Sequence, residues 1–342
     1  MTRRPLVTAL VLSYNGWPLL AECLRNVTAQ DWPGLDILVV DNGSTDNTAA
    51  NVRREFPQAR LLSLPKNIGF AAANNAGVEH SPAEYMALIS NDVYLPTNFI
   101  SRLVAALEAD PLAAIAGPGV YNLKLNMAHY PGNGTMSLTG TIIQSAFKDP
   151  SLTFGAAGCS LVYKRNLLGP PFDPDYGFFH EEIHLAWRAR LMGYRVLRLP
   201  DTVVKHIGGA TVGDLSDDNR FLLERNRCLN FLTLFAPWTR LRVWPLMWLA
   251  RAAERLSDRR QGRSSAPIRR ARAWVRAHAG EIADKRRLLQ SQRSVPDAEI
   301  VRWMSGKLTN HTGFGGWLLN LLSRGWCRLV GLKTWEGWER KQ

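Results

Sequence analysis

The chain contains little cysteine, and its four cysteines lie far apart. Cys23, Cys159, Cys228 and Cys327 form no CxxC pair and no spacing typical of a zinc site. This argues against a disulfide framework and against a cysteine-based metal centre. We expect reduced, mostly buried thiols in a reducing compartment.

Long apolar runs are also missing. The stretches of Trp and Leu near the C-terminus are interrupted by Arg240, Arg242, Arg324 and Arg328, and none approaches the ~20 residues of a spanning helix. At the N-terminus, MTRRPLVTALVLSYN has an apolar run of only about eight residues and no small-residue cleavage site after it. We therefore expect a first strand there rather than a signal peptide.

Two common phosphate-binding loops are absent as well. The sequence has no Walker loop and no GxGxxG motif. These absences argue against nucleotide hydrolysis and against dinucleotide redox chemistry.

Positive charge is concentrated in the C-terminal third of the chain. The 342 residues have a net charge of +13, yet residues 221–342 alone hold 24 Lys and Arg against 9 Asp and Glu. Nine of the twelve tryptophans lie in the same part. This change of composition predicts a boundary between a near-neutral front domain and a basic, Trp-rich tail.

The front half alternates apolar strand patterns with amphipathic helix patterns. Strands are predicted in LVTALVLSYN, LDILVVDNGSTD, ARLLSLPKN, EYMALISND, AAIAGPGVYN and VLRLPDTVVKHIGGAT, and a Gly-led loop runs into a strand in FGAAGCSLVYKRNLL. Residues 123–150 are predicted to be loops or short strands, and helices are expected to dominate after residue 217. The alternation predicts an α/β fold whose mostly parallel sheet is covered on both faces.

Polar residues stand where three predicted strands end: Asn15, Asp41 and Asp92. Ligands of such sheets bind outside the carboxyl ends of the strands. A carboxylate at position 41 can accept a hydrogen bond from a nucleobase or a ribose. Asp92 can either cap the following turn or bind a divalent cation together with a substrate diphosphate. The residues around it leave both interpretations open.

Six segments occur in a characteristic order. They are LVTALVLSYNGWPLLAECLRNVTAQ, ILVVDNGSTDNT, PKNIGFAAANNAGV, ALISNDVYLP, FDPDYGFFHEEIHLAWRARLMGYRV and VVKHIGGAT. Together they resemble the family 2 glycosyltransferases of GT-A fold, in particular the rhamnosyltransferase-like members, over residues 5–235. The resemblance implies a catalytic GT-A domain at 1–220, with a donor half at 1–120 and an acceptor half at 121–220. A helical basic region is then expected at 221–342.

The resemblance also implies roles for particular residues. Asp92 would be the metal ligand of a DxD-like motif, and His206 would approach the metal or the diphosphate. Glu182 would be the catalytic base, with Glu181 beside it. The expected donor-binding residues are Ser13, Asn15, Asp41, Asn42, Gly69, Asn74, Asn91 and Gly158.

Two motifs depart from the pattern that this resemblance implies. The DxD-like motif reads Ser90-Asn91-Asp92 and keeps only its last acid, so metal binding is expected to need the donor diphosphate. The usual Glu-Asp-x-Asp reads Glu181-Glu182-Ile183-His184.

The implied chemistry needs a cation and a base. A divalent cation, Mg²⁺ or Mn²⁺, neutralises the charge that grows on the diphosphate, and a carboxylate takes the proton of the acceptor hydroxyl. A metal and a base on opposite sides of the anomeric carbon suit one displacement with inversion. We expect the helix start to favour the ionised form of Glu182. Glu181 and Glu182 could instead have no catalytic role and simply complement the helix dipole. His206 could instead be a hydrogen-bonded polar side chain at a strand end that binds neither metal nor diphosphate.

The Trp and Arg of the tail are typical of amphipathic helices on an anionic bilayer. The alternatives are packing onto the catalytic domain and contacts with an acceptor or a second copy. These observations predict a cytoplasmic enzyme, peripheral on the inner face of the membrane.

The leading functional hypothesis is sugar transfer from a nucleoside-diphosphate sugar to a glycan or lipid-linked glycan, with dTDP-rhamnose first among the donors and UDP- or GDP-sugars next. A non-catalytic sugar-nucleotide-binding scaffold is the second hypothesis. A basic nucleic-acid binder is the third, and because no known binding module is present, nucleic acid is not expected as a partner.

Overall fold

The computed structural model describes residues 4–128, 135–143, 149, 151–208 and 216–338. The chain forms two compact units. Unit 1 comprises residues 1–132, 150–189 and 194–212, and unit 2 comprises residues 133–149, 190–193 and 213–342. Unit 2 thus includes three short segments of the predicted catalytic domain, residues 133–149, 190–193 and 213–220.

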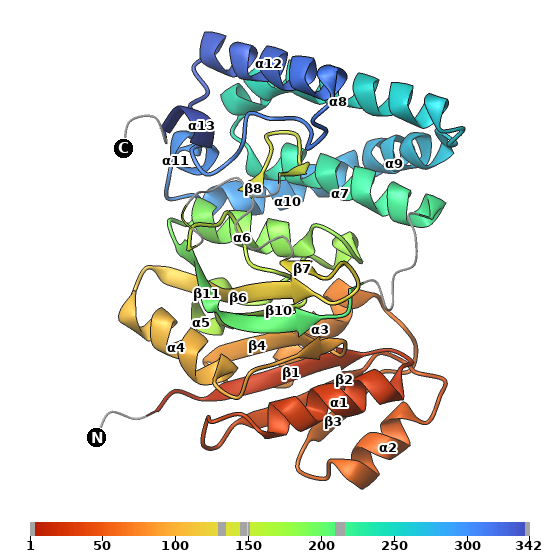
Figure 1. Cartoon of the computed structure of the whole chain (residues 1–342), viewed down its shortest axis with the longest axis vertical. Helices are drawn as coiled ribbons and strands as arrows, with labels where there is room; N and C mark the ends of the chain where they lie inside the picture. Colours follow the sequence, from red (N-terminus) through yellow and green to blue (C-terminus); the bar gives the residue numbers. More distant parts are fainter. Residues whose placement is uncertain (1–3, 129–134, 144–148, 150, 209–215, 339–342) are drawn as a thin grey trace. The chain divides into compact units, whose positions relative to one another are not determined.

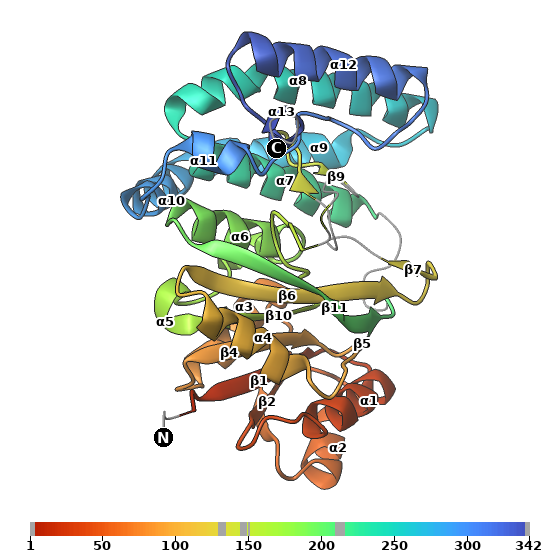
Figure 2. The same ribbon diagram turned by 60° about the vertical axis from the view of Figure 1, so that its left-hand side comes forward.

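Unit 1 is built on one sheet. The strands of the chain are β1 (Val7–Ser13), β2 (Asp36–Asp41), β3 (Arg60–Ser63), β4 (Tyr85–Ser90), β5 (Val93–Tyr94), β6 (Ala113–Asn122), β7 (Met127–Ala128), β8 (Thr135–Met136), β9 (Ile142–Ile143), β10 (Ser160–Lys164) and β11 (Arg195–His206). The order in the large sheet is β3-β2-β1-β4-β10-β6-β11-β5, with β7 paired to β6 (Figures 1 and 2). β10 runs antiparallel to β4 and β6, β5 runs antiparallel to β11, and β7 runs antiparallel to β6. The prediction of a mostly parallel α/β sheet is confirmed.

Helices follow the strands in the predicted alternation. In unit 1 they are α1 (Trp17–Thr28), α2 (Thr48–Glu55), α3 (Phe70–Glu79), α4 (Phe99–Ala109), α5 (Arg165–Leu168), the 3₁₀ turn η1 (Pro174–Tyr176) and most of α6 (Glu181–Leu191). The apolar side chains that recur every four residues along α6 are buried, since Ile183, Trp187 and Leu191 are at most 2% exposed.

The core of unit 1 lies on both faces of the sheet. Ala9 and Val11 of β1 and Val39 of β2 point to one face, in the hydrophobic cluster that also holds the buried side chains of α1, α2 and α4. Leu10 of β1 points to the other face, where it contacts Gly77 of α3 so closely that a Cβ at Gly77 would lie 2.4 Å from its Cδ1. Because both faces are covered, β1, β2 and β4 are almost entirely apolar between their ends.

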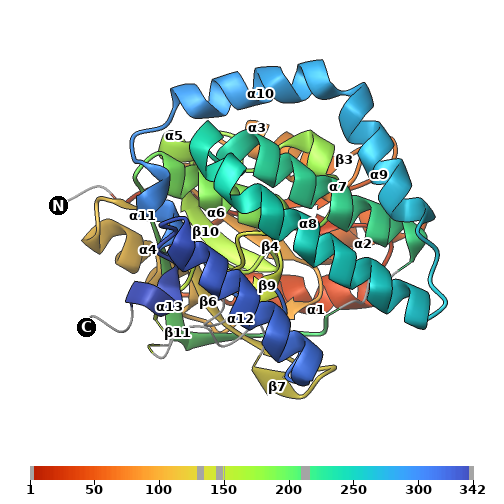
Figure 3. The ribbon, with the colours of Figure 1, turned by 90° about the horizontal axis from the view of Figure 1, so that it is seen from above.

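Unit 2 is helical apart from the small β8–β9 hairpin. Its helices are α7 (Asp217–Leu234), α8 (Pro237–Arg260), α9 (Ala266–Ala277), α10 (Ala279–Ser291), α11 (Asp297–Val301), α12 (Phe314–Leu329) and α13 (Trp335–Trp338). α8 and α12 lie side by side (Figure 3). Within the described parts of the chain, no helix combines the length and apolar character needed to span a bilayer.

The four cysteines are free in this structure. Cys23, Cys159 and Cys327 are buried and Cys228 is partly buried, as the sequence predicted.

Candidate active site

The carboxyl ends of β1 and β2 bring four predicted donor-binding residues together. Ser13 is paired with Asp41, and the Asn42 N–H donates to the Ser13 carbonyl at 2.8 Å. Asn91, which follows β4, donates from Nδ2 to Ser13 Oγ at 3.2 Å. All four residues are buried, so these bonds fix a polar edge at the end of an apolar sheet.

Asn15 holds the loop after β2 against the loop after β1. Its backbone is left-handed, with φ of 41°, and its Oδ1 accepts from the Thr45 N–H at 2.8 Å. Ser44 accepts from the Asn15 N–H and donates its own N–H to the Asp41 carboxylate. Asp46 accepts from the N–H groups of Thr48 and Gly16, so it caps the start of α2 and also ties the two loops.

Gly69 shapes the turn that leads into α3. Its φ of 88° is left-handed, and its carbonyl accepts from Asn42 Nδ2 at 3.4 Å. A Cβ at Gly69 would lie 3.6 Å from Gly177, so the turn also lies close to the segment that precedes α6. Gly69 thus joins the group around Ser13 and Asn42.

Asp92 and His206 form the second half of the site. His206 Nε2 lies 3.2 Å from Asp92 Oδ2. Burial alone would lower the pKa of His206, but hydrogen bonds to Asp92 and to the Cys159 thiol raise that pKa to about 10. Cys159 was not predicted from the sequence, although its place at the start of a strand was.

Glu182 lies at the start of α6, against Gly158. A Cβ added to Gly158 would lie 3.4 Å from the Cβ and 3.5 Å from the Cγ of Glu182. Gly158 is the neighbour of Cys159, which bonds His206. A continuous series of contacts therefore runs from Asp92 through His206, Cys159 and Gly158 to Glu182.

The two glutamates at the start of α6 both have raised pKa values. Burial raises the pKa of Glu182 to about 7, although the N–H groups of Glu182 and Ile183 lower it in part. Burial and the charge of Glu182 raise the pKa of Glu181 well above its usual range. The N–H groups at the helix start favour the ionised form of Glu182, as expected, but the loss of solvent outweighs them and the pKa is raised.

Two of the predicted site residues, Asn74 and Glu181, make no hydrogen bond within the described residues to the groups at the strand ends. Asn74 is buried in α3 and donates to the Phe70 carbonyl of its own helix at 2.9 Å. Glu181 is 4% exposed, and its Oε2 has no hydrogen-bond partner within the described residues. Arg188 of α6 donates to the carbonyls of Leu168, the last residue of α5, and of Pro170.

The approach to α6 carries a feature that no sequence pattern indicated. Phe179 and His180 both have left-handed backbones, with φ of 70° and 64°. Such conformations are rare for side chains of this size and cluster at functional sites. They set the direction in which α6 begins and hence the position of Glu182.

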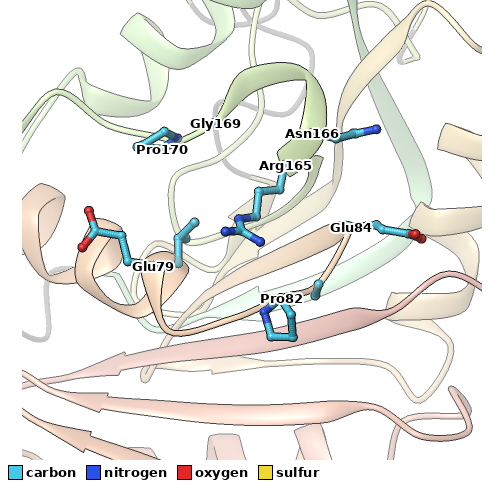
Figure 4. Close-up of a pocket in the computed structure, with 9 residues that line it drawn as sticks. Glu79, Pro82, Glu84, Arg165, Asn166, Gly169 and Pro170 are labelled. Atoms are coloured by element: carbon cyan, nitrogen blue, oxygen red, sulfur yellow. The ribbon is translucent and has the colours of Figure 1, made fainter.

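A separate pocket lies at the opposite end of β4 (Figure 4). It is lined by Glu79, Glu84, Arg165, Asn166 and their neighbours, and Glu84 directly precedes the strand. Because ligands of this type of sheet bind at the carboxyl ends, we do not assign the donor to this pocket.

Two of the assembled side chains can bind a divalent cation. The described residues contain no cluster of three His, Cys, Asp or Glu able to hold a metal ion. Asp92 and His206 offer one oxygen and one nitrogen at a separation that two ligands of one ion can have, once the ion displaces the proton that the raised pKa of His206 keeps on its imidazole. The pair fits a cation whose remaining ligands are diphosphate oxygens and water.

Part of the chain matches a known family model. Residues 8–168 match the model of Glycosyl transferase family 2. A poly-beta-1,6-N-acetyl-D-glucosamine synthase of Staphylococcus aureus is 24% identical over 213 residues, which cover 61% of this chain and 52% of that protein. The chain spans about half the length, or less, of the curated relatives it matches.

Solved structures share the fold at low identity. GalNAc-T7 with UDP, GalNAc and Mn²⁺ has a TM-score of 0.57 and 13% identity, over 74% of this chain and 51% of that one. TarS 1–349 of S. aureus in complex with UDP has a TM-score of 0.56 and 16% identity, over 98% and 92%. Residues 8–168 therefore resemble the family 2 glycosyltransferases, and the likeness to these structures shows that the chain has the GT-A fold.

Proposed function

We propose that this protein is an inverting, metal-dependent glycosyltransferase that uses a nucleoside-diphosphate sugar. The observation that carries the proposal is the series of contacts from Asp92 and His206 to Glu182, since it joins a cation-binding pair to a base on one edge of the sheet. The similarity to proteins solved with UDP supports the donor class, and Mn²⁺ beside UDP in GalNAc-T7 supports a divalent cation.

The residues divide the reaction between them. Asp41, Ser13 and Asn91 bind and orient the nucleotide part of the donor at the ends of β1, β2 and β4. A cation on Asp92 and His206 would neutralise the diphosphate as it leaves. Glu182, when ionised, takes the proton of the acceptor hydroxyl during attack.

The finer assignments rest on the resemblance of the six sequence segments. dTDP-rhamnose is the proposed donor, with UDP- and GDP-sugars next, and the acceptor is a glycan or lipid-linked glycan in synthesis of cell-surface polysaccharide. The tail is proposed to attach the enzyme to the inner face of the membrane. Asn74, Gly69 and Gly158 are proposed to line the donor site, and Glu181 to support Glu182.

A non-catalytic sugar-nucleotide-binding protein is the second candidate. The observation in its favour is that only two described side chains, Asp92 and His206, meet at the proposed cation position. It predicts donor binding without turnover.

One assay separates the two candidates. Release of nucleoside diphosphate is followed over time with Mg²⁺ or Mn²⁺, donor and acceptor, for the wild type and for Glu182→Gln. We expect release to be lost in the variant while donor binding, measured by thermal shift, is retained. Donor binding without release in the wild type would favour the second candidate, and unchanged release in the variant would exclude Glu182 as the base.

A further inference from the structure

Two helices of unit 2 carry large apolar side chains that face solvent. On α8, Trp238, Trp244 and Trp248 are 72%, 61% and 69% exposed. On α12, Phe314, Trp317 and Leu321 are 77%, 52% and 45% exposed. We call these six side chains the α8–α12 face. Contiguous exposed apolar surface of this kind marks a binding site in a folded protein.

The two helices are joined by a hydrogen bond and lie side by side (Figures 1 and 3), so we treat their exposed sides together. Trp326 of α12 donates its indole N–H to the Arg242 carbonyl of α8 at 2.8 Å. The opposite sides of both helices are occupied: Val243 and Leu246 of α8 are buried, and Ser323 of α12 donates to the Gly306 carbonyl. The α8–α12 face is thus the solvent-exposed side of these two helices, which lie side by side in Figures 1 and 3.

The charge beside this face has one sign. Arg242, Arg255, Arg259 and Arg260 of α8 and Arg328 of α12 are exposed. α12 has no acidic residue, and the two acids of α8 are engaged in ion pairs, Glu254 with Arg227 and Arg251, and Asp258 with Arg220. The cations beside the face are therefore left to attract an anionic partner.

We propose that the α8–α12 face docks on an anionic lipid bilayer, with its aromatic side chains in the interface and its arginines on the headgroups. The inference rests on the proposed function in one respect, since it identifies the surface by which the enzyme meets a lipid-linked acceptor. Trp combines an apolar ring with an N–H donor and is favoured at bilayer interfaces. Helices with this division of Trp and Arg lie in the plane of the membrane. A second copy of the chain fits less well, because it would bring like charges together.

The test is sedimentation of the full chain with vesicles of phosphatidylcholine, with or without phosphatidylglycerol. We expect the wild type to bind the anionic vesicles, and the triple variant Trp244→Ser, Trp248→Ser, Trp317→Ser to lose at least about tenfold in binding. Arg242→Gln and Arg328→Gln should each lower binding by about fivefold at low salt. Leu288→Ser is the matched control, because Leu288 of α10 is 63% exposed but lies outside the face; it should bind as the wild type does.

Three outcomes would overturn the proposal: no binding by the wild type, equal binding by the triple variant, or loss of an oligomer in the triple variant with no vesicle binding by either protein. The last, seen by analytical ultracentrifugation, would identify the face as a contact between copies. Circular dichroism checks that the variants fold. The donor thermal shift is measured in parallel, so vesicle binding without a donor shift would reject the proposed function and leave the docking surface standing.

Discussion

Asp92 and His206 meet because a strand of two residues follows Asp92. Val93 of β5 is paired with His206 of β11, and the Ile207 N–H donates to the Asp92 carbonyl at 3.1 Å. This pairing sets the Asp92 carboxylate 3.2 Å from the imidazole, although β4 and β11 are separated in the sheet by β10 and β6. The position of the proposed cation is therefore determined by backbone hydrogen bonds as well as by the two side chains.

The first prediction concerns the metal ligand. Asp92→Asn should lower metal-dependent release of nucleoside diphosphate on the order of 100-fold, because it removes the negative charge that binds the cation. Glu84→Gln is the matched control, since Glu84 precedes the same strand and lines the pocket in Figure 4. The control should keep its rate within about twofold, as a surface substitution outside a site does. Equal losses in both variants would contradict the assignment of the cation to the carboxyl end of β4.

The second prediction compares the two ends of β2. Asp41→Asn should weaken nucleotide binding about tenfold, because a neutral amide is a poorer acceptor for the donor than a carboxylate. Asp36→Asn should leave that affinity unchanged, since Asp36 binds Arg60 at 2.6 Å at the other end of the strand. Removing this partly exposed ion pair should cost about 1 kcal/mol at most in the free energy of unfolding. Titration calorimetry with the nucleoside diphosphate measures the affinity, and urea unfolding measures the stability. Weaker nucleotide binding in Asp36→Asn alone would reverse the assignment.

The sequence predicted the sheet because β1, β2 and β4 are almost entirely apolar between their ends. For the same reason Asn15, Asp41 and Asp92 stood out as strand-end groups, and the structure places them there. The two-residue strand β5 was not predicted, since Val93 and Tyr94 are too few to form a pattern. The left-handed pair Phe179 and His180 left no signal either, because Phe does not favour that conformation and a single His forms no pattern.

Contacts between segments that are distant in the sequence were also not predicted. Nothing in the residues around Gly158 indicated that its missing side chain leaves room for Glu182. The raised pKa of Glu182 depends on what buries it, whereas the sequence showed only that a helix begins there.

The third prediction uses this contact. In Gly158→Ala the added Cβ would lie 3.4 Å from Glu182, which is ordinary van der Waals contact, so the rate should change less than about threefold. In Gly158→Val the branched side chain must displace the Glu182 carboxylate, and the rate should fall at least tenfold, since a base acts only within hydrogen-bond reach. The rate is measured with saturating donor, and donor affinity is measured separately. A large loss in the alanine variant would contradict the prediction, because it would indicate that the loop itself is disturbed.

The fourth prediction concerns pH. Glu182 must be ionised to accept a proton, and burial raises its pKa to about 7. The rate of transfer should therefore be low in acid, rise with pH through about 7 and then level off. Glu84→Gln should keep this profile. A rate that falls across the same range would contradict the role of Glu182 as a base.

The fifth prediction concerns stability, because the raised pKa of Glu182 makes the free energy of unfolding depend on pH. The ordinary pKa of glutamate is 4.5, so between about pH 4.5 and pH 7 the folded state holds the proton that the unfolded state has released. The stability contributed by protonated Glu182 is fully present below pH 4.5 and is lost as the pH rises through about 7. Glu182→Gln cannot ionise, so at pH 8 its Tm should exceed that of the wild type by about 4–5 °C, since a rise in pKa from 4.5 to about 7 corresponds to about 3 kcal/mol. At pH 5 the two proteins should melt within about 1 °C of each other, because the native carboxyl is then neutral like the amide. A variant that melts below the wild type at pH 8 would indicate that the surroundings stabilise the ionised form of Glu182. A different titrating group would then have to explain the pH dependence of the rate.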